Sequence, residues 1–177
     1  QIRDLEAAKD DLTDVISQLE GEMESAFLES FQKINENFNR TFGELFGGGS
    51  ARLYLSDEND VLNSGIEIQV SPPGKVIKNL SALSGGEQAL VAISIYFAIL
   101  AVNPSPFCIL DEIEAALDDA NIGYYADYLK EYSKGTQFIV VTHRKGTMER
   151  CNSLFGVAME EQGVSRMVSV SLQDYQE

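Results

Sequence analysis

The stretch Phe107-Cys108-Ile109-Leu110-Asp111-Glu112 places four apolar residues directly before two carboxylates. An apolar run without polar alternation is typical of a strand buried on both faces of a parallel sheet. In such sheets, ligands bind at the carboxyl ends of the strands. The stretch therefore predicts an α/β fold in which Asp111 and Glu112 lie at a ligand-binding edge. Acidic residues also end strands for solubility alone, so the pattern needs support from the rest of the chain.

A second apolar strand, residues 138–142, precedes the sole histidine, His143. Predicted strands and helices alternate in this half of the chain, and adjacent parallel strands would bring Asp111, Glu112 and His143 to one edge. We expect Asp111 to hold Mg²⁺, directly or through water, and Glu112 to polarise the water that attacks a γ-phosphate. His143 would donate to the phosphate or to that water, although a histidine at a strand end can also be structural.

The segment Leu83-Ser84-Gly85-Gly86-Glu87-Gln88 stands immediately before a predicted helix over residues 86–102. Ser84 can cap this helix, the two glycines let the backbone approach an anion, and a helix start offers N–H groups with a favourable dipole. Taken alone, Ser-Gly-Gly is a common cap and turn. Its place upstream of the Asp-Glu and His motifs favours a phosphate-binding role.

Residues 1–46 contain no proline and only two glycines, so they predict one long helix. Its first part has the heptad seam of a coiled coil, formed by Leu5, Leu12, Leu19 and Ala26. Apolar residues three to four apart then describe a face that enters a globular core, namely Phe27, Phe31, Ile34, Phe38, Phe42 and Phe46. The alternative for the first part is an ordinary amphipathic helix packed on its own domain. We divide the chain into this coiled-coil helix, residues 1–46, and a lobe, residues 47–177.

The lobe begins where three glycines, residues 47–49, end the helix. The pattern that follows predicts a β-hairpin with a long acidic loop, and a largely parallel sheet flanked by helices comes after it. The predicted hairpin strands are residues 51–55 and 66–70. After the helix at residues 86–102 we expect strands at 107–110, 137–142, 154–159 and 167–172, and helices at 120–132 and 145–151.

Composition limits the partners of the chain. Its 177 residues include 28 acidic and 13 basic side chains, a formal net charge of −15. This charge opposes unaided binding to nucleic acid, so contact with DNA must come from a partner or a local patch. Lys75 and Lys78 lie near the Ser-Gly-Gly segment and are candidates for a contact with the DNA backbone, but with this net charge we favour solvation or a contact on the ATP side for them.

Three further features of the sequence predict a reduced, cytoplasmic setting. The longest apolar run, residues 89–102, is too short to span a membrane, and no secretory signal is seen. Cys108 and Cys151 lie far apart and lack the spacing of metal ligands. Because the sequence starts at Gln1 rather than at a methionine, we also expect it to be a piece of a longer polypeptide.

The ordered set LSGGEQ, FCILDE, LDD and THR resembles the ATP-binding-cassette ATPases. Longer strings are similar to one branch of them, the structural maintenance of chromosomes (SMC) proteins. These strings are SPPGK ahead of LSALSGGEQ, then DEIEAALDDAN, and finally FGVAM followed by GVS. Over nearly its whole length, the chain resembles the carboxy-terminal half of an SMC head, which implies the α/β fold of that lobe with an amino-terminal coiled-coil helix.

The resemblance implies a role for each matching residue. The signature motif, which closes over the γ-phosphate of ATP on the opposing head, matches Ser84, Gly85, Gly86, Glu87 and Gln88. Residues 107–111 match Walker B, with Asp111 toward Mg²⁺, and Glu112 matches the catalytic glutamate. Asp118 belongs to the D-loop, which crosses the dimer interface, and His143 matches the switch histidine.

One part of an ATP site is missing from the sequence. No segment satisfies the phosphate-loop pattern G-x-x-x-x-G-K-[ST], since Gly74-Lys75 is followed by Val76. The family carries this loop in the amino-terminal half of the head. We therefore expect negligible ATP hydrolysis by this chain alone, and an ATPase only in the complete head dimer.

The resemblance also implies partners, and a membrane is not among them. They are the amino-terminal half of the head, a second SMC head across the ATP sandwich, the carboxy-terminal winged-helix domain of a kleisin subunit, and DNA through the full complex. The kleisin is expected near the final strands and the helix of residues 124–132, whose tyrosines we expect to be partly core. The implied function is chromosome condensation and segregation at the nucleoid in the cytoplasm.

Other functions remain open at this point. The chain could be the head of another SMC-like DNA-repair ATPase, RecN-like or of the zinc-hook type, or a nucleotide-silent scaffold for kleisin. The strings Pro-Pro-Gly-Lys and Leu-Asp-Asp-Ala-Asn favour SMC. A scaffold needs neither Glu112 nor His143, and the opening helix and hairpin do not fit a transporter subunit.

Overall fold

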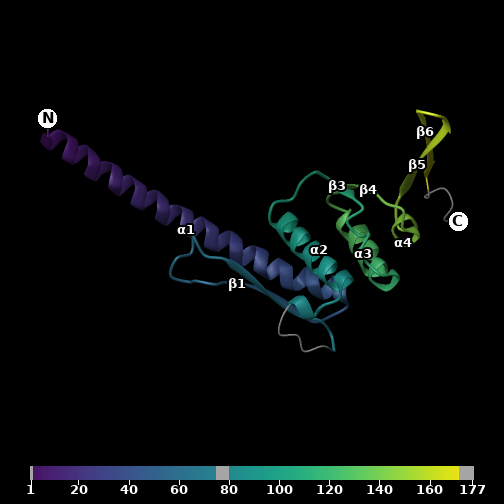
Figure 1. The fold of residues 1–177 in the computed structure, drawn as a ribbon, viewed down its shortest axis with the longest axis horizontal. Coiled ribbons are helices and arrows are strands. Elements are labelled where there is room, and N and C mark those ends of the chain that lie inside the picture. Colours follow the sequence, from purple (N-terminus) through teal and green to yellow (C-terminus); the bar gives the residue numbers. More distant parts are fainter. Residues whose placement is uncertain (1, 75–79, 172–177) are drawn as a thin grey trace.

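A long helix leads into a globular body in the computed structural model, which describes residues 2–74 and 80–171 (Figure 1). Lys75 and Lys78 lie outside these residues. The elements are α1 (Ile2–Phe46), β1 (Ser50–Leu55), β2 (Ile66–Ser71), the 3₁₀ turn η1 (Leu80–Ala82), α2 (Gly85–Val102), β3 (Phe107–Asp111), α3 (Asp119–Tyr132), β4 (Gln137–Val141), α4 (Lys145–Met148), β5 (Ser153–Glu161) and β6 (Val164–Ser171).

Helix α1 is exposed in its first half and buries one face in its second half. Leu12, at 64% exposure, and Leu19, at 52%, belong to the heptad seam and face solvent, while the side chain of Leu5 lies outside the described part. Phe38 and Phe42 are fully buried. The predicted long helix is confirmed, and its apolar face enters the body as the three-to-four spacing indicates.

The edge of β1 is held by two asparagines of α1. Asn35 donates from Nδ2 to the Leu53 carbonyl (3.0 Å) and accepts from the Leu53 N–H (2.8 Å). Asn39 accepts from the Ala51 N–H at 3.0 Å. Because an unpaired strand edge leaves backbone donors and acceptors open, these amides act on β1 as a neighbouring strand would. The helix is thereby fixed in its rotation relative to the hairpin.

Helix α2 is apolar on all sides because it packs into two cores. By length and composition alone it could cross a membrane. The apolar run predicted from the sequence, residues 89–102, is shorter than this helix, which begins at Gly85. With 18 residues the helix reaches the minimum length of a membrane span. The first core joins it to α1 and the β1–β2 hairpin, and contains Phe38, Phe42, Ala51, Leu53, Val70, Leu83, Val91 and Ala98. The second joins it to β3 and α3, and contains Leu45, Leu90, Ile93, Phe97, Cys108, Leu110, Leu117, Ile122, Tyr125 and Leu129.

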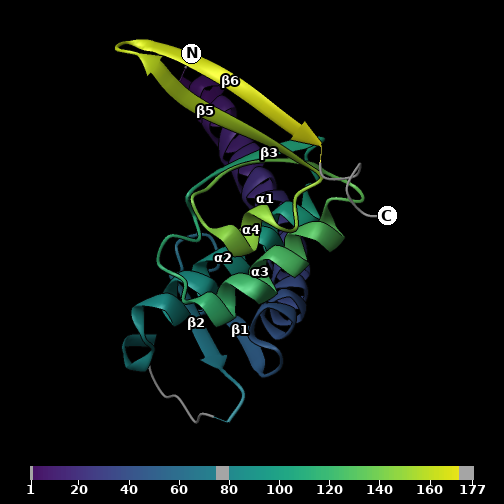
Figure 2. The same cartoon turned by 90° about the vertical axis from the view of Figure 1, so that its right-hand side faces the viewer.

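The described strands pair two by two. β1 and β2 are antiparallel, as the predicted hairpin requires, and β3 and β4 are parallel, with Cys108 opposite Phe138. β5 and β6 form an antiparallel hairpin that projects from the body (Figure 2). The α/β class holds, but within the described residues the parallel arrangement is restricted to β3 and β4. Only two residues separate β5 from β6, too few for the crossover that parallel strands need, and Gly163 takes the positive φ of a tight turn (85°).

Core packing of α1 can be tested by replacing Phe38 with alanine. Loss of a fully buried ring leaves a cavity, so we expect Phe38→Ala to lower the free energy of unfolding by about 3–5 kcal/mol. Urea denaturation followed by circular dichroism measures this value. Leu12→Ala, in the exposed half of the same helix, is the matched control and should change it by less than about 0.5 kcal/mol. Equal losses in both variants would contradict this division of α1.

Candidate functional site

Parallel pairing brings the predicted acidic and histidine residues to one edge of the β3–β4 sheet. Asp111 lies opposite Val141, and the N–H of Glu112 continues the ladder by donating to the Val141 carbonyl at 2.9 Å. His143 follows two residues later, with its Nδ1 3.2 Å from Glu112 Oε1. Both side chains are more than half exposed. The predicted meeting of these residues at one sheet edge is confirmed.

The backbone of Glu112 is strained. Its φ of 48° lies in the left-handed region, and among the described non-glycine residues only Glu112 has a positive φ. This conformation costs free energy and persists only where the surrounding structure holds it, a condition that clusters at functional sites. Glutamate carries no sequence signal for a left-handed backbone, so the sequence did not predict this feature.

The loop that begins at Glu112, residues 112–118, is held by several hydrogen bonds. Its own turns are closed by the Ala115 N–H on the Glu112 carbonyl (3.0 Å) and the Leu117 N–H on the Glu114 carbonyl (2.9 Å). Nη2 of Arg144 donates to the carbonyls of Ala115 (2.9 Å) and Leu117 (3.1 Å). This loop ends at Asp118, whose Oδ1 accepts from the Asn121 N–H at 2.9 Å. Asp118 is therefore the N-cap of α3, whatever else it does.

A capping box begins α2. Ser84 accepts at Oγ from the Glu87 N–H (3.3 Å), and Glu87 Oε2 accepts from the Ser84 N–H (2.9 Å). Gln88 Nε2 ties the preceding loop down through the Leu80 and Leu83 carbonyls, at 3.2 Å each. The cap uses Oγ of Ser84 as an acceptor, so its O–H can still donate to an anion. The structural cap and the phosphate-binding role are thus compatible.

Gly86 brings this motif against the loop at residues 112–118. A Cβ on Gly86 would lie 3.1 Å from the Ala116 carbonyl oxygen, whereas a Cβ on Gly85 would meet nothing within 4 Å. The SGG motif therefore packs against the backbone around Ala116, four residues after Glu112. Gly86 supplies a close backbone approach that a side chain would disturb.

Asp111 is a single carboxylate that could contribute to a metal site but does not form one by itself. Among residues 2–74 and 80–171 no three His, Cys, Asp or Glu side chains gather as they would to hold an ion. Mg²⁺ in phosphoryl-transfer sites takes one or two carboxylates and completes its shell with phosphate oxygens and water. Asp111, exposed at the end of β3, suits that partial role.

A buried polar group lies beneath the exposed site. Glu114 is 1% exposed and its Oε1 accepts from Oγ1 of Thr147, which is also buried, at 3.2 Å. Burial raises the pKa of the nearby Tyr125 hydroxyl, and the Glu114 carboxylate raises it further. Neither Glu114 nor Arg144 was predicted to matter. Their only sequence signal was their position just after Asp111-Glu112 and Thr142-His143. Neither residue lies in a segment whose periodicity predicts burial.

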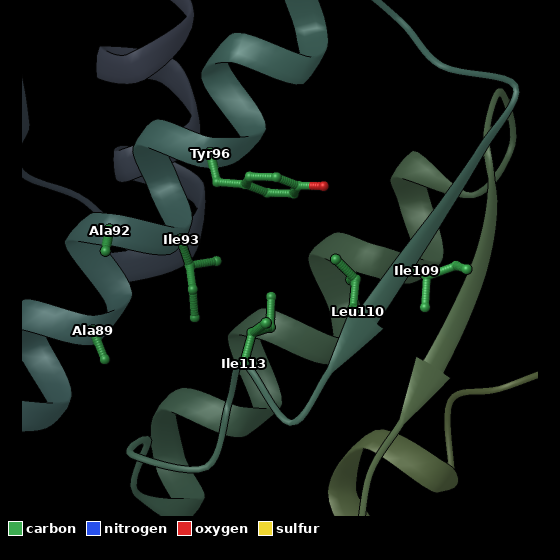
Figure 3. Close-up of a pocket in the computed structure, with 7 residues that line it drawn as sticks. All are labelled: Ala89, Ala92, Ile93, Tyr96, Ile109, Leu110 and Ile113. Carbon is green, nitrogen blue, oxygen red and sulfur yellow. The ribbon is translucent and has the colours of Figure 1, made fainter.

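An apolar hollow of about 380 Å³ lies between α2 and β3, lined by Ile93 and Tyr96 of α2, by Ile109 and Leu110 of β3, and by Ile113 (Figure 3). Tyr96 is hydrogen-bonded to the Cys108 thiol at 2.8 Å, and this bond, with burial, raises the pKa of Tyr96 to about 12. Neighbouring side chains of β3 and β4 are half exposed, namely Phe107, Ile109, Ile139 and Val141. A continuous apolar face of this kind marks an interaction surface.

Comparison with known proteins identifies the family. Residues 4–166 match the model described as RecF/RecN/SMC N terminal domain. The chain belongs to the RecF/RecN/SMC family. It is 54% identical over 177 residues to the chromosome partition protein Smc of Bacillus subtilis (strain 168), covering all of this chain and 15% of that protein. It is 53% identical over 171 residues to Smc of Halothermothrix orenii, covering 97% of this chain and 14% of that protein.

Solved structures of SMC proteins share the fold. The Smc head domain of Pyrococcus furiosus, with an extended coiled coil and bound to the C-terminal domain of ScpA, superposes with a TM-score of 0.83 at 43% identity. The match covers 98% of this chain and 43% of that one. A structure from work on ATP-driven dimerization and DNA stimulated activation of SMC ATPases gives 0.77 at 44% identity, covering 86% and 92%. These matches agree with the α/β fold and its long amino-terminal helix.

The two glycines of the SGG motif provide a matched test of the contact with residues 112–118. Gly85→Ala should keep or raise the free energy of unfolding by up to about 1 kcal/mol, since alanine favours a helix and the space is open. Gly86→Ala should be about 1–2 kcal/mol less stable than Gly85→Ala, because Arg144 fixes the carbonyls on both sides of Ala116. Thermal and urea unfolding measure the difference. Equal stability would contradict the close packing.

Proposed function

We propose that this chain is the carboxy-terminal lobe of an SMC ATPase head that acts in chromosome condensation and segregation. The contact between Glu112 and His143 at the β3–β4 edge carries the proposal. The matching family model is described as an N-terminal domain, so the choice of lobe rests on the order of the motifs in the sequence. In this proposal residues 1–46 form the coiled-coil helix that leads into the head, and residues 47–177 form the lobe.

Glu112 is the proposed base. Its carboxylate lies at the open edge of the sheet, and the imidazole of His143 orients it from one side. ATP would supply the γ-phosphoryl group, with Mg²⁺ held at Asp111. Glu112 then accepts a proton from the attacking water, while His143 donates to the phosphate side of the reaction.

The remaining wall of the nucleotide pocket would come from the amino-terminal half of the head. That half carries the phosphate loop in SMC proteins, and this sequence has no G-x-x-x-x-G-K-[ST] segment. The exposed apolar face of β3 and β4 is a suitable surface for it, because packing there would remove Phe107 and Ile109 from water. This chain alone would then hydrolyse ATP negligibly.

The signature residues would act on the ATP of a second head. The Ser84 O–H and the backbone N–H groups of Gly85 and Gly86 lie at the start of α2, where a helix offers unpaired donors to an anion. Glu87 and Gln88 hold this start in place. Nucleotide favours the engaged pair of heads because its γ-phosphate is contacted from both sides. ATP-driven dimerization of a solved SMC relative supports this arrangement.

The β5–β6 hairpin is the proposed site of the kleisin winged-helix domain. Its exposed apolar side chains include Phe155, Val157, Met159 and Met167. The Pyrococcus furiosus relative is bound to the C-terminal domain of ScpA, which supports a partner of this kind. Helix α3 offers less exposed apolar surface: Tyr124 is half exposed, but Tyr125 is fully buried and the Tyr128 hydroxyl lies 3.3 Å from Thr41 Oγ1. DNA would be reached through the full complex, at the nucleoid in the cytoplasm.

The catalytic role of Glu112 is tested in a complete head, made by mixing this chain with a matching amino-terminal half. Glu112→Gln removes the proton acceptor and keeps the shape, so ATP turnover should fall about 100-fold or more while ATP binding changes less than about threefold. Phosphate release and nucleotide binding by fluorescence measure the two quantities. Unchanged turnover would remove Glu112 from the role of base.

Ser84→Arg tests the signature motif. A bulky cation at the start of α2 should block engagement of two heads and leave ATP binding to each head intact, because the nucleotide pocket of its own head lies elsewhere. Light scattering with ATP measures dimerisation, in the Glu112→Gln background to slow hydrolysis. Asn59→Arg, which adds the same charge to the exposed β1–β2 loop, is the control and should dimerise normally. Dimerisation of the Ser84→Arg head would overturn the assignment.

A further inference from the structure

The carboxyl group of Glu114 is costly where it lies. Its side chain is 1% exposed, and Oε1 accepts one hydrogen bond from Thr147 Oγ1 at 3.2 Å. Oε2 is buried without a hydrogen-bond partner among the described residues, and so is the hydroxyl of Tyr125. A buried carboxylate with an unsatisfied oxygen destabilises a fold compared with an apolar side chain of similar volume. Stability therefore does not explain a glutamate at this position.

Position offers a better explanation. Glu114 lies two residues after Glu112, whose φ of 48° needs support from its surroundings. Thr147 belongs to α4, which begins two residues after His143. The hydrogen bond between Glu114 and Thr147 thus joins the segment that follows the proposed base to the segment that follows the histidine beside it.

A second connection joins the same two segments on the outer side. Arg144 Nη2 donates to the carbonyls of Ala115 and Leu117, one residue either side of Ala116. With the Glu112 N–H on the Val141 carbonyl, three connections hold the loop on either side of the positive φ of Glu112. Only the Glu114 connection runs through the buried interior.

We propose that Glu114 is a positioning residue, which holds Glu112 in its left-handed backbone conformation by anchoring the loop to Thr147 and so aims the Glu112 carboxylate at the attacking water. This inference rests on the proposed ATPase function. Glu114 itself touches neither the nucleotide nor the water. Its effect on hydrolysis passes through Glu112.

The first test compares two variants of Glu114 in the complete head described above. Glu114→Leu removes the acceptor at similar volume, so turnover number should fall at least about tenfold, with the KM for ATP changed less than about twofold. Thermal stability should stay equal or rise, because an unsatisfied carboxylate is removed. Glu114→Gln keeps an oxygen for Thr147 and should retain turnover within about threefold. Wild-type turnover in Glu114→Leu, or a loss in Glu114→Gln as large as in Glu114→Leu, would overturn the inference.

Thr147 gives a matched pair from the other end of the hydrogen bond. Thr147→Val keeps the shape and loses the donor, so its turnover should fall about as far as that of Glu114→Leu. Thr147→Ser keeps the donor and should stay within about threefold of the wild type. Similar turnover in the two Thr147 variants would contradict a role for this hydrogen bond.

A double-mutant comparison separates positioning from general damage. If Glu114 acts through Glu112, adding Glu114→Leu to a Glu112→Gln head should lower single-turnover hydrolysis less than about twofold further. A loss by the same factor in both backgrounds would indicate a structural role alone and overturn the inference. Failure of the proposed function is seen separately, since Glu112→Gln by itself would then leave turnover unchanged.

Discussion

The parallel pairing of β3 with β4 is the constraint on which the functional end of this molecule depends. It sets Asp111 opposite Val141 and lets the Glu112 N–H take the next carbonyl of the ladder. A shift of one residue in this register would turn every side chain of the shifted strand to the opposite face and separate Glu112 from His143. The apolar character of both strands follows from the same requirement, because one face is buried by α2 and α3 and the other is left as an apolar surface.

Helix α2 connects this end to the rest of the body. Phe97 and Leu90 belong to the core with β3 and α3, whereas Val91 and Ala98 belong to the core with α1 and the β1–β2 hairpin. Its first turn carries the capped SGG motif, and Gly86 lies against the loop that follows Glu112. Both groups of proposed ATP-contacting residues are therefore built on one packed unit.

Sequence patterns predicted what periodicity and order encode. Apolar runs marked β3 and β4, the absence of proline marked α1, and the strand ends marked Asp111, Glu112 and His143. Features that depend on tertiary contacts were not predicted. Nothing in the residue type of Glu112 indicates a positive φ, and the burial of Glu114 arises in a turn that has no period. The β5–β6 hairpin was predictable, since Gln162-Gly163 between two strands is a turn signal. The alternation of strands and helices earlier in the lobe led instead to the prediction of a largely parallel sheet.

The rigid attachment of α1 has a mechanical consequence. Its 45 residues form a rod of about 68 Å, and only its final turns are embedded. Asn35 and Asn39 fix the rotation of this helix about its axis relative to β1, while Phe38 and Phe42 pack it against α2. A tilt of about 5° at these contacts would therefore move the far end of the helix by about 5 Å. A small rearrangement where α1 packs on α2 and β1 is in this way converted into a large displacement at the far end of the helix, and a force applied to that far end acts back on the same contacts.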